Sequence, residues 1–339
     1  MKSTKIAIVG CGFLGTSLAK YLKDFFSVTT FDVFPQPKLL QNYNIEHKIC
    51  DVTNFNQLQE KIETTSIIVH TVATNLANIP SNSLAYDINI KGIQNVCETV
   101  SKNESIRGMI LCSSWHVYGD QDISGDISED YGYRPDKVEE RAKIYALSKV
   151  IQDCIVRFFD KKQDEKIFGA FRLGTILDYN MRNDTAAGKF ITKALAGDDV
   201  TPYKHSMNRS MFFISMNDVC KSFKSFIDYI LTKDKKNIGD VDHIFNLAYP
   251  TPVKIIDLAN SIIDSVKKNS NGKILPKLSI VDLGIEETDS QIQHQARDMI
   301  QIDISKINEY LNISSLTKPE DVIDQIIRSR LDKSDESHG

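Results

Sequence analysis

The fold is decided by residues 6–15, Ile6-Ala7-Ile8-Val9-Gly10-Cys11-Gly12-Phe13-Leu14-Gly15. The first four are apolar and mostly β-branched or small, as expected of a buried parallel strand. The glycine turn leads into a helical pattern of apolar residues over 18–22, and a second strand-like run at 28–31 ends in Asp32. Strand, glycine turn, helix, strand and acidic residue together form the pattern of a dinucleotide-binding unit.

Each glycine of this turn has a separate physical role. Gly10 permits the tight turn, Gly12 lets the backbone approach a pyrophosphate, and Gly15 lets the helix pack closely against the strand. The N-terminus of the helix presents unpaired N–H groups and a positive dipole end to the phosphates. The motif therefore predicts that the cofactor is bound by Gly10, Gly12, Phe13, Leu14 and Gly15.

Asp32 predicts which dinucleotide is bound. It follows Gly10 by 22 residues, the position from which a carboxylate accepts hydrogen bonds from the ribose 2′-hydroxyl. The same carboxylate would repel a 2′-phosphate, and no arginine follows in residues 33–36. The sequence therefore favours NAD over NADP.

The alternation of strands and helices continues along the chain. Residues 45–50, 67–70 and 109–112 form further strand-like runs, and residues 83–101 form a helical stretch between the last two. Such alternation predicts an α/β fold, with a doubly wound parallel sheet of the Rossmann type and ligands at the carboxyl ends of its strands.

Composition excludes several classes of protein. The 339 residues include 41 Lys and Arg against 45 Asp and Glu, a net charge of −4. The sequence therefore lacks the excess of basic residues that is typical of nucleic-acid-binding proteins. No apolar run reaches the roughly 18 residues of a membrane span. The six cysteines form no CxxC pair and no zinc spacing, which predicts no metal site and reduced thiols in a cytoplasmic protein.

The candidate catalytic residues follow the run at 109–112. Ser114 lies two residues after it, and Tyr145 and Lys149 lie four residues apart, on one face of a predicted helix. To act as a base near neutrality, a tyrosine must have its pKa lowered by about 3 from its ordinary value near 10. The ammonium of Lys149 and a positive nicotinamide ring would lower it, and Ser114 would bond the same substrate oxygen. The spacing is common by chance and gains its weight from the nucleotide motif that precedes it.

The chain resembles the extended short-chain dehydrogenase/reductase family, which includes NAD-dependent nucleotide-sugar epimerases and dehydratases. The resemblance rests on short motifs spread over nearly the whole sequence. They are Asn89–Val96 (like the family's NVxGTxNV helix), Leu111–Gly119 (SSxxVYG), Tyr145–Lys149 (YxxxK), Phe171–Gly174 (FRxx), the pair Asp51-Val52, and residues 211–219, 245–247 and 297–298.

The resemblance implies roles for individual residues. Tyr145 would be the base and acid, Lys149 would bind the nicotinamide ribose and lower the pKa of Tyr145, and Ser114 would assist. Asp51 and Val52 would contact the adenine. Asn89 would belong to a supporting hydrogen-bond network, and a simple helix cap is its alternative role.

Departures from the family pattern bear on the reaction. The glycine motif is GxGxxG, one residue shorter than the usual GxxGxxG. Trp115 and His116 stand where dehydratases carry Asp-Glu, which argues against a 4,6-dehydratase. Some sugar-acid dehydrogenases of the family have Asn-His there, so His116 favours net redox chemistry. Its alternative role is that of a loop histidine bonded to the backbone.

Two arginines are candidates for the phosphates of the substrate. Met211 replaces an expected arginine, and Arg209 would share its face if the segment is a strand. Arg297 is the second candidate. Solubilising surface arginines are the alternative interpretation of both. Thr175 stands at the position of the family's asparagine after FRxx.

We therefore expect an NAD-dependent nucleotide-sugar epimerase. The alternatives are a net NAD-dependent dehydrogenase or reductase of a sugar or sugar nucleotide, and a non-catalytic NAD-binding regulatory module. Residues 1–173 would bind NAD and carry the catalytic residues, and 174–330 would mainly form a smaller substrate-binding lobe, with about 209–250 returning to the sheet. Residues 331–339 would be a frayed tail. The resemblance also implies a homodimer through the helices around 83–101 and 139–160.

Overall fold

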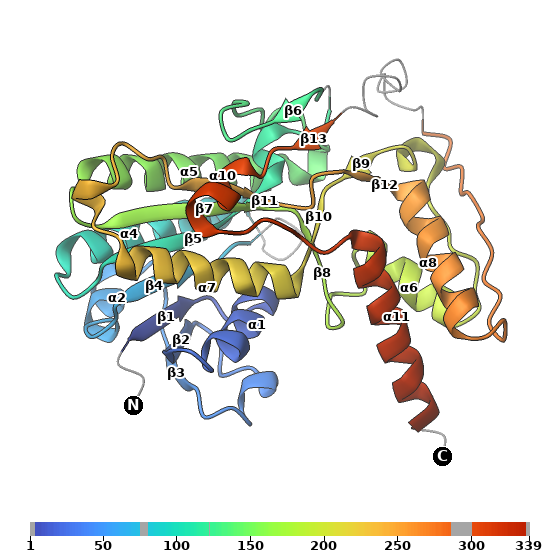
Figure 1. Ribbon diagram of the computed structural model, residues 1–339, viewed down its shortest axis with the longest axis horizontal. Helices are drawn as coiled ribbons and strands as arrows, with labels where there is room; N and C mark the ends of the chain where they lie inside the picture. Colours follow the sequence, from blue (N-terminus) through green and yellow to red (C-terminus); the bar gives the residue numbers. More distant parts are fainter. Residues whose placement is uncertain (1–3, 75–80, 122, 286–299, 337–339) are drawn as a thin grey trace.

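A seven-stranded parallel sheet forms the centre of the computed structural model, which describes residues 4–74, 81–121, 123–285 and 300–336 (Figure 1). The strands follow one another in the order β11-β7-β5-β4-β1-β2-β3. Their bounds are β1 (Lys5–Val9), β2 (Ser27–Asp32), β3 (Glu46–Ile49), β4 (Ile67–His70), β5 (Gly108–Ser114), β7 (Ile167–Leu173) and β11 (Ile244–Leu247). This order confirms the predicted doubly wound fold.

The central strands are buried on both faces. Every residue of β4, β5 and β7 is buried, as their nearly continuous apolar sequences require. The strand order reverses between β1 and β4, which are parallel neighbours in the sheet. Ligands of doubly wound sheets bind at such a reversal, and the glycine turn after β1 lies there.

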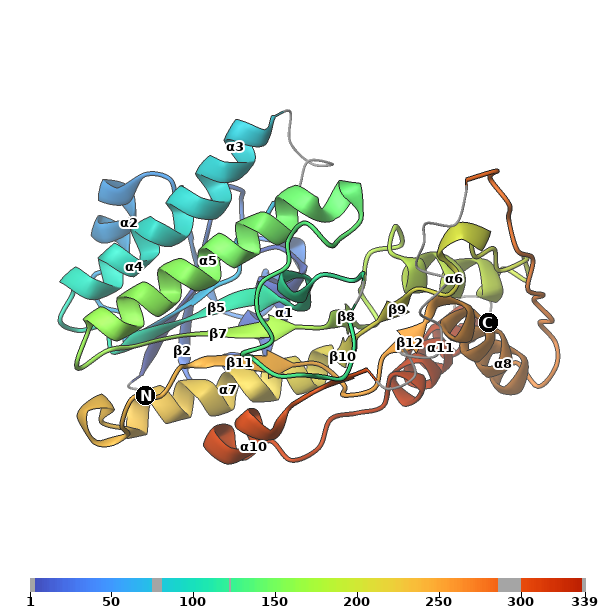
Figure 2. The ribbon, with the colours of Figure 1, turned by 90° about the horizontal axis from the view of Figure 1, so that it is seen from above.

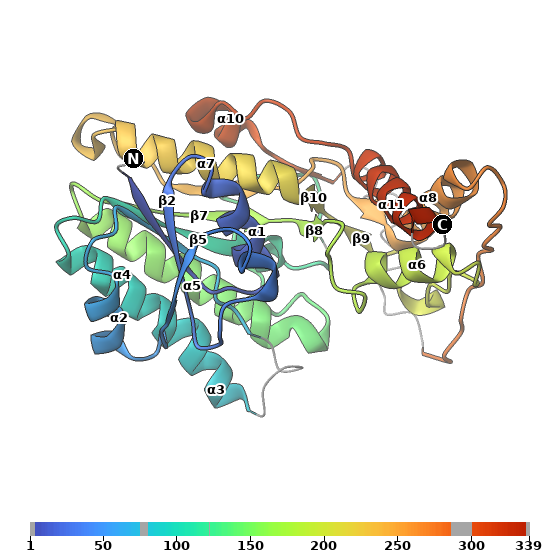
Figure 3. The same cartoon turned by 90° about the horizontal axis from the view of Figure 1, so that it is seen from below.

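Helices cover both faces of the sheet (Figures 2 and 3). One face is packed by α1 (Phe13–Leu22), α7 (Met216–Thr232) and α10 (Ser305–Leu311) around one apolar core. The other is packed by α2 (Phe55–Lys61), α4 (Gly92–Lys102) and α5 (Lys143–Lys162) around a second core. The predicted helix at 83–101 consists of α3 (Asn82–Tyr86), a π-helical turn (Asp87–Lys91) and α4.

A smaller lobe lies beyond the carboxyl ends of the strands. Its core is formed largely by α6 (Ala186–Leu195), α8 (Ile255–Asn269) and α11 (Pro319–Glu336). Two short strand pairs connect it to the sheet, β8 (Thr175–Leu177) with β10 (Phe213–Ser215) and β9 (Ser210–Met211) with β12 (Val253–Lys254). A further pair joins β6 (Asp126–Ile127) and β13 (Gln301–Ile302). Short 3-10 turns occur at 38–40, 115–118, 140–142, 204–206 and 235–237.

The expectation of a frayed tail from residue 331 is wrong for most of that segment. Helix α11 continues to Glu336. Leu331 packs against the core of the lobe, Arg330 donates to the carbonyl of Tyr179, and Lys333 lies over the Tyr179 ring. These contacts hold a polar sequence in a helix. Among the described residues, no helix has the length and apolar character that a membrane crossing requires.

Candidate active site

The glycine turn has the tight geometry that its predicted roles require. Gly10 has φ +102°, a conformation that side chains disfavour. A Cβ atom at Gly15 would lie 1.9 Å from the carbonyl oxygen of Gly10, so the start of α1 touches the turn. A Cβ atom at Gly12 would have no neighbour within 4 Å. The backbone at Gly12 therefore faces open space, as an approaching ligand needs.

Asp32 is placed beside this turn. One carboxylate oxygen accepts a hydrogen bond from the Cys11 backbone N–H at 2.5 Å, and the other accepts one from the Phe34 N–H at 3.1 Å. Each oxygen can accept a second hydrogen bond. The carboxylate thus helps to fix the glycine turn and remains half-buried at the strand edge.

The next strand end carries Asp51 and Val52. Asp51 is exposed, and its Oδ1 accepts from the backbone N–H and hydroxyl of Thr53, both at 2.8 Å. Val52 is buried against Gly92, where an added Cβ atom would lie 2.8 Å from a Val52 methyl group. Only the carboxylate of this pair is available to a ligand at the surface.

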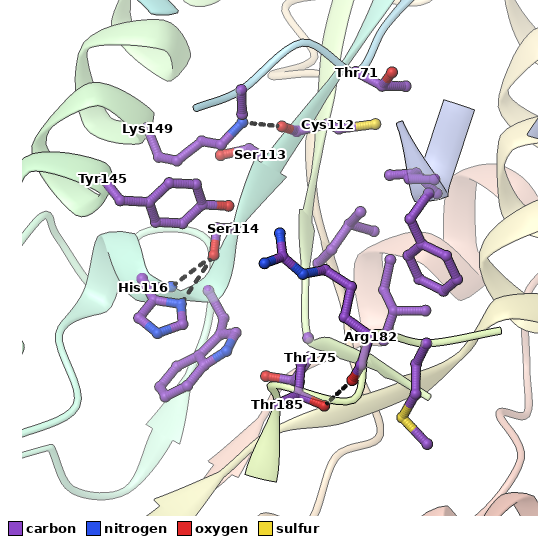
Figure 4. A pocket seen from close by; sticks show the side chains of 18 residues that line it. Thr71, Cys112, Ser113, Ser114, His116, Tyr145, Lys149, Thr175, Arg182 and Thr185 are labelled. Carbon is purple, nitrogen blue, oxygen red and sulfur yellow. Dashed lines mark hydrogen bonds between the residues drawn. The ribbon is translucent and has the colours of Figure 1, made fainter. Parts of the chain in front are cut away.

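A pocket of about 290 Å³ lies where the sheet meets the lobe (Figure 4). Residues from the glycine turn, the end of β5, helix α5 and the loop between β8 and α6 line it. Six predicted site residues meet there: Phe13, Leu14, Ser114, His116, Tyr145 and Lys149. The strand, turn and helix patterns predicted from the sequence thus converge in one cavity.

Ser114 lies beside two of the pocket's ionisable side chains. It ends β5, and its hydroxyl lies 3.1 Å from Nδ1 of His116 and accepts from the His116 backbone N–H at 3.3 Å. The same hydroxyl lies close enough to the Tyr145 phenol to lower its pKa. The rings of His116 and Tyr145 meet edge to face, with centroids 6.0 Å apart. Phenol, hydroxyl and imidazole therefore lie next to one another.

The expected lowering of the Tyr145 pKa by Lys149 does not occur in the protein alone. Burial raises the pKa of Tyr145 to about 12, although the nearby Ser114 hydroxyl opposes the increase. Burial also lowers the pKa of Lys149 to about 8. Its ammonium donates to the carbonyl of Cys112 at 2.6 Å and lies 5.6 Å from the centre of the Tyr145 ring. The predicted lowering also requires a positive nicotinamide ring, so it stays a prediction for the protein with NAD bound.

Asn89 orders the loop that follows β4. Its side-chain amide accepts from the backbone N–H of Thr74 at 2.8 Å and donates to the Thr74 carbonyl at 2.9 Å. Gln152 of α5 donates to the Asn89 carbonyl at 2.7 Å. Asn89 lies in the π turn, and Ser81 caps the helix instead. The structure thus places Asn89 in a supporting network outside the pocket, and the helix-cap alternative is wrong.

A buried network fixes α5 against the sheet. Arg172, the arginine of the FRxx strand, is 1% exposed and donates to Asp153 at 2.8 Å and to the Tyr118 hydroxyl at 2.7 Å. Tyr118 in turn donates to Asn246 of β11 at 2.5 Å. Asp153 lies one helical turn after Lys149. The network therefore sets the position of the helix that carries Tyr145 and Lys149.

The structure does not bring Arg209 to the pocket. Its guanidinium forms an ion pair with Glu139 and lies 3.7 Å from a carboxylate oxygen of Asp120. These acidic groups lie in the segment before α5, far from Arg209 in the sequence, so residue spacing could not reveal them. Arg209 therefore links the lobe to that segment, and its role toward a phosphate stays a prediction. Arg297 lies outside the described residues.

Comparisons with known proteins agree with this geometry. The model of the 3-beta hydroxysteroid dehydrogenase/isomerase family matches residues 6–156. The N-acetyl-alpha-D-glucosaminyl-diphospho-ditrans,octacis-undecaprenol 4-epimerase of Escherichia coli O157:H7 is 24% identical over 286 residues, covering 81% of this chain and 74% of that protein. Both matches agree with the resemblance to the extended short-chain dehydrogenase/reductase family that the sequence motifs indicate.

Solved structures share the architecture of this chain. UDP-N-acetylglucosamine 4-epimerase from Bacillus cereus superposes with a TM-score of 0.71 at 19% identity, covering 96% of both chains. The NAD complex of dTDP-glucose 4,6-dehydratase from Bacillus anthracis str. Ames gives 0.74 at 18% identity, covering 98% of both. At these identities the likeness shows a shared fold only.

Several residues that line the pocket were not identified by the sequence analysis. Thr71 lines the pocket and donates to the Gly10 carbonyl at 2.8 Å. Its position directly after β4 was the available signal, because strand carboxyl ends meet at one edge. Met181, Arg182 and Thr185 line the opposite wall from an irregular loop, whose sequence carries no comparable signal.

Proposed function

We propose that this protein is an NAD-dependent epimerase that acts on a nucleotide sugar. The observation that carries the proposal is the meeting of Ser114, Tyr145 and Lys149 in one pocket beside the glycine turn. A binding module would need neither the buried phenol nor the serine beside it. The relatives named as 4-epimerases support the reaction class.

The residues present fit an NAD molecule. The open space at Gly12, the N-terminus of α1 and the carboxylate of Asp32 form a cradle for a pyrophosphate and a ribose. The buried hydroxyl of Ser113 lines the pocket and has no hydrogen-bond partner among the described residues. Gly10, Gly12, Gly15 and Asp32 would therefore hold the cofactor, with Asp51 at the adenine. When bound, NAD supplies a hydride acceptor and a positive ring.

Tyr145 would remove the proton from the reacting sugar hydroxyl. Its pKa of about 12 keeps the phenol protonated at neutral pH, so it is in the acid form before substrate binds. Reaching a pKa near 7 requires about 7 kcal/mol of additional stabilisation of the phenolate. Lys149 can contribute only in its charged form, below a pH of about 8. Ser114 would hold the sugar oxygen and bond the phenolate.

In the epimerase, the keto sugar rotates within the pocket, so that its other face is presented when the ketone is reduced. Tyr145 then returns the proton, so the enzyme ends in its starting state. The substrate would be a sugar linked through a diphosphate. The Escherichia coli relative is named for a sugar on diphospho-undecaprenol rather than on a nucleotide. A lipid-linked sugar diphosphate therefore belongs in the substrate panel.

The second candidate function is a net dehydrogenase, which the contact between Ser114 and His116 favours. A dehydrogenase must release the hydroxyl proton to solvent at every turnover. The half-buried His116, 3.1 Å from the Ser114 hydroxyl, provides an acceptor between Tyr145 and solvent. An epimerase returns the proton and has no need for this route.

The test is a screen of purified protein with NAD and UDP-, GDP-, dTDP- and CDP-sugars, followed by NMR of the product and absorbance at 340 nm. The epimerase yields a new sugar without a lasting absorbance change. The dehydrogenase accumulates one NADH for each oxidised sugar. Bound NAD with no product from any sugar, including the lipid-linked one, would favour the regulatory module.

We also propose a cytoplasmic homodimer. On α5, Phe158 is 60% exposed and Leu147 is 36% exposed, on a helix that covers the outer face of the sheet (Figure 2). The six cysteines are free thiols, as expected in a reducing compartment. Light scattering tests the dimer. F158E is expected to give monomers, and an unchanged mass would exclude this interface.

A further inference from the structure

The wall of the pocket opposite Tyr145 is a firmly anchored loop. It runs from β8 to α6, and Met181 within it is buried. The hydroxyl of Thr185 caps α6 by accepting from the Gly188 N–H at 3.1 Å, and it donates to the carbonyl of Arg182 at 2.9 Å. A Cβ atom at Gly188 would lie 2.2 Å from that carbonyl. The main chain at Arg182 is therefore fixed by the start of the helix.

The Arg182 side chain extends from this loop into the pocket, with its guanidinium directed toward Ser114 and Tyr145 (Figure 4). It forms a two-point ion pair with Asp184, in which Nε lies 3.0 Å from Oδ1. The two side chains are 60% and 57% exposed. An ion pair so open to water is weak, so a ligand can replace Asp184 at little cost.

The charges around the pocket favour an anion. Arg182 and Lys149 are both lining residues, and none of the described lining residues carries a carboxylate. Lys149 is buried and bonded to the Cys112 carbonyl, which leaves Arg182 as the accessible cation of this wall. A planar guanidinium matches a carboxylate through two parallel hydrogen bonds.

The position of Arg182 determines which part of a substrate carries the negative charge. In the proposed function, the reacting hydroxyl must lie against Tyr145 and Ser114. A guanidinium directed at the same two residues then meets substituents of the sugar ring near the reacting carbon. The diphosphate would lie farther out, where the substrate leaves the pocket.

We propose that Arg182 binds a carboxylate on the sugar ring, so that the substrate is a nucleotide-linked uronic acid. This inference rests on the proposed function and names its substrate class. Arg182 is the specificity-determining residue, and Asp184 holds its guanidinium in the absence of the sugar carboxylate. The reaction at the neighbouring hydroxyl is otherwise unchanged.

Matched sugar pairs that differ only in the carboxylate test this proposal. Calorimetry measures the binding of UDP-glucuronate against UDP-glucose, and of GDP-mannuronate against GDP-mannose, to the NAD-loaded protein. The wild type is expected to prefer the acid of at least one pair by about fivefold, the upper end for a partly exposed ion pair with two-point geometry. R182Q should lose this preference, and R182K should keep part of it. R328Q, on the exposed face of α11, should retain it in full.

The binding measurement does not depend on turnover, so the two proposals can fail separately. Equal affinity of the wild type for acid and neutral sugars would overturn the carboxylate proposal. A wild type that binds none of these nucleotide sugars would overturn it as well. An equal loss for both sugars in R182Q would assign Arg182 to the diphosphate and would also overturn it. Preference for the acid without any turnover would preserve this inference and refute the epimerase. Thermal melting of R182Q checks that the variant is folded.

Discussion

Two glycines of the same turn are expected to respond in opposite ways to an added methyl group. In G15A, the new Cβ atom would lie 1.9 Å from the Gly10 carbonyl oxygen, so the backbone itself must move. Overpacking of this kind costs about 3 kcal/mol when no flexible side chain can yield. For a chain of 339 residues, the melting temperature should fall by roughly 4 °C.

G12A is the matched control, because its Cβ atom would enter open space. Gly12 has φ −68°, which alanine adopts without strain. The melting temperature without cofactor should therefore change by less than about 2 °C. The methyl group would, however, occupy the space through which a pyrophosphate approaches. We expect the affinity for NAD to fall at least about tenfold.

Calorimetric melting with and without NAD, together with NAD titration, separates the two effects. The expected pattern is a destabilised G15A and a stable G12A that binds NAD weakly. A G12A protein with the affinity of the wild type would refute the assignment of the turn to the cofactor. A G15A protein with an unchanged melting temperature would refute the packing argument.

Three further perturbations address the catalytic residues and their support. Y145F should lower kcat by roughly 10²- to 10⁴-fold with NAD affinity unchanged, measured by product NMR, and an unaffected kcat would end the proton-transfer role. Lys149 has a pKa of about 8 in the folded protein and an ordinary pKa of 10.5 in the unfolded chain. Burial of its charge therefore lowers the free energy of unfolding in full below pH 8, and this loss disappears as the pH rises to 10.5. Urea unfolding of wild type relative to K149M should therefore show a gain of up to about 3 kcal/mol between pH 7 and pH 11, and a flat difference would contradict the buried charge. D153N leaves Arg172 buried without its carboxylate and should lower the free energy of unfolding by about 3–5 kcal/mol. E98Q, which breaks the partly exposed ion pair with Lys102, should lower it by less than about 1 kcal/mol.

Features set by local sequence were predictable. The first strand, the turn at Gly10–Gly15 and the acid at the end of the next strand follow one another along the chain. The alternation of strands and helices indicates a parallel sheet. Tyr145 and Lys149 share a helix face because their spacing is that of one turn. Each of these depends on at most a few tens of residues.

Features set by distant partners were not predictable. The ion pair of Arg209 with Glu139 joins residues 70 positions apart. The raised pKa of Tyr145 depends on burial by several elements, and the direction of Arg182 depends on an irregular loop held by α6. The length of α11 likewise depends on Tyr179, which lies 151 residues before Arg330. No short motif encodes such contacts.

The path of the chain has a consequence for how substrate preference can change in evolution. After residue 173 the chain enters the lobe, returns through α7 and β11, enters the lobe again, and returns once more through α10 before α11. A chain cut after residue 173 would expose the edge of β7 and remove half of the apolar layer beneath the sheet. The lobe therefore cannot be exchanged as a cassette by a single recombination event. New substrates must be acquired through substitutions and loop changes made in place, while the shared sheet remains intact.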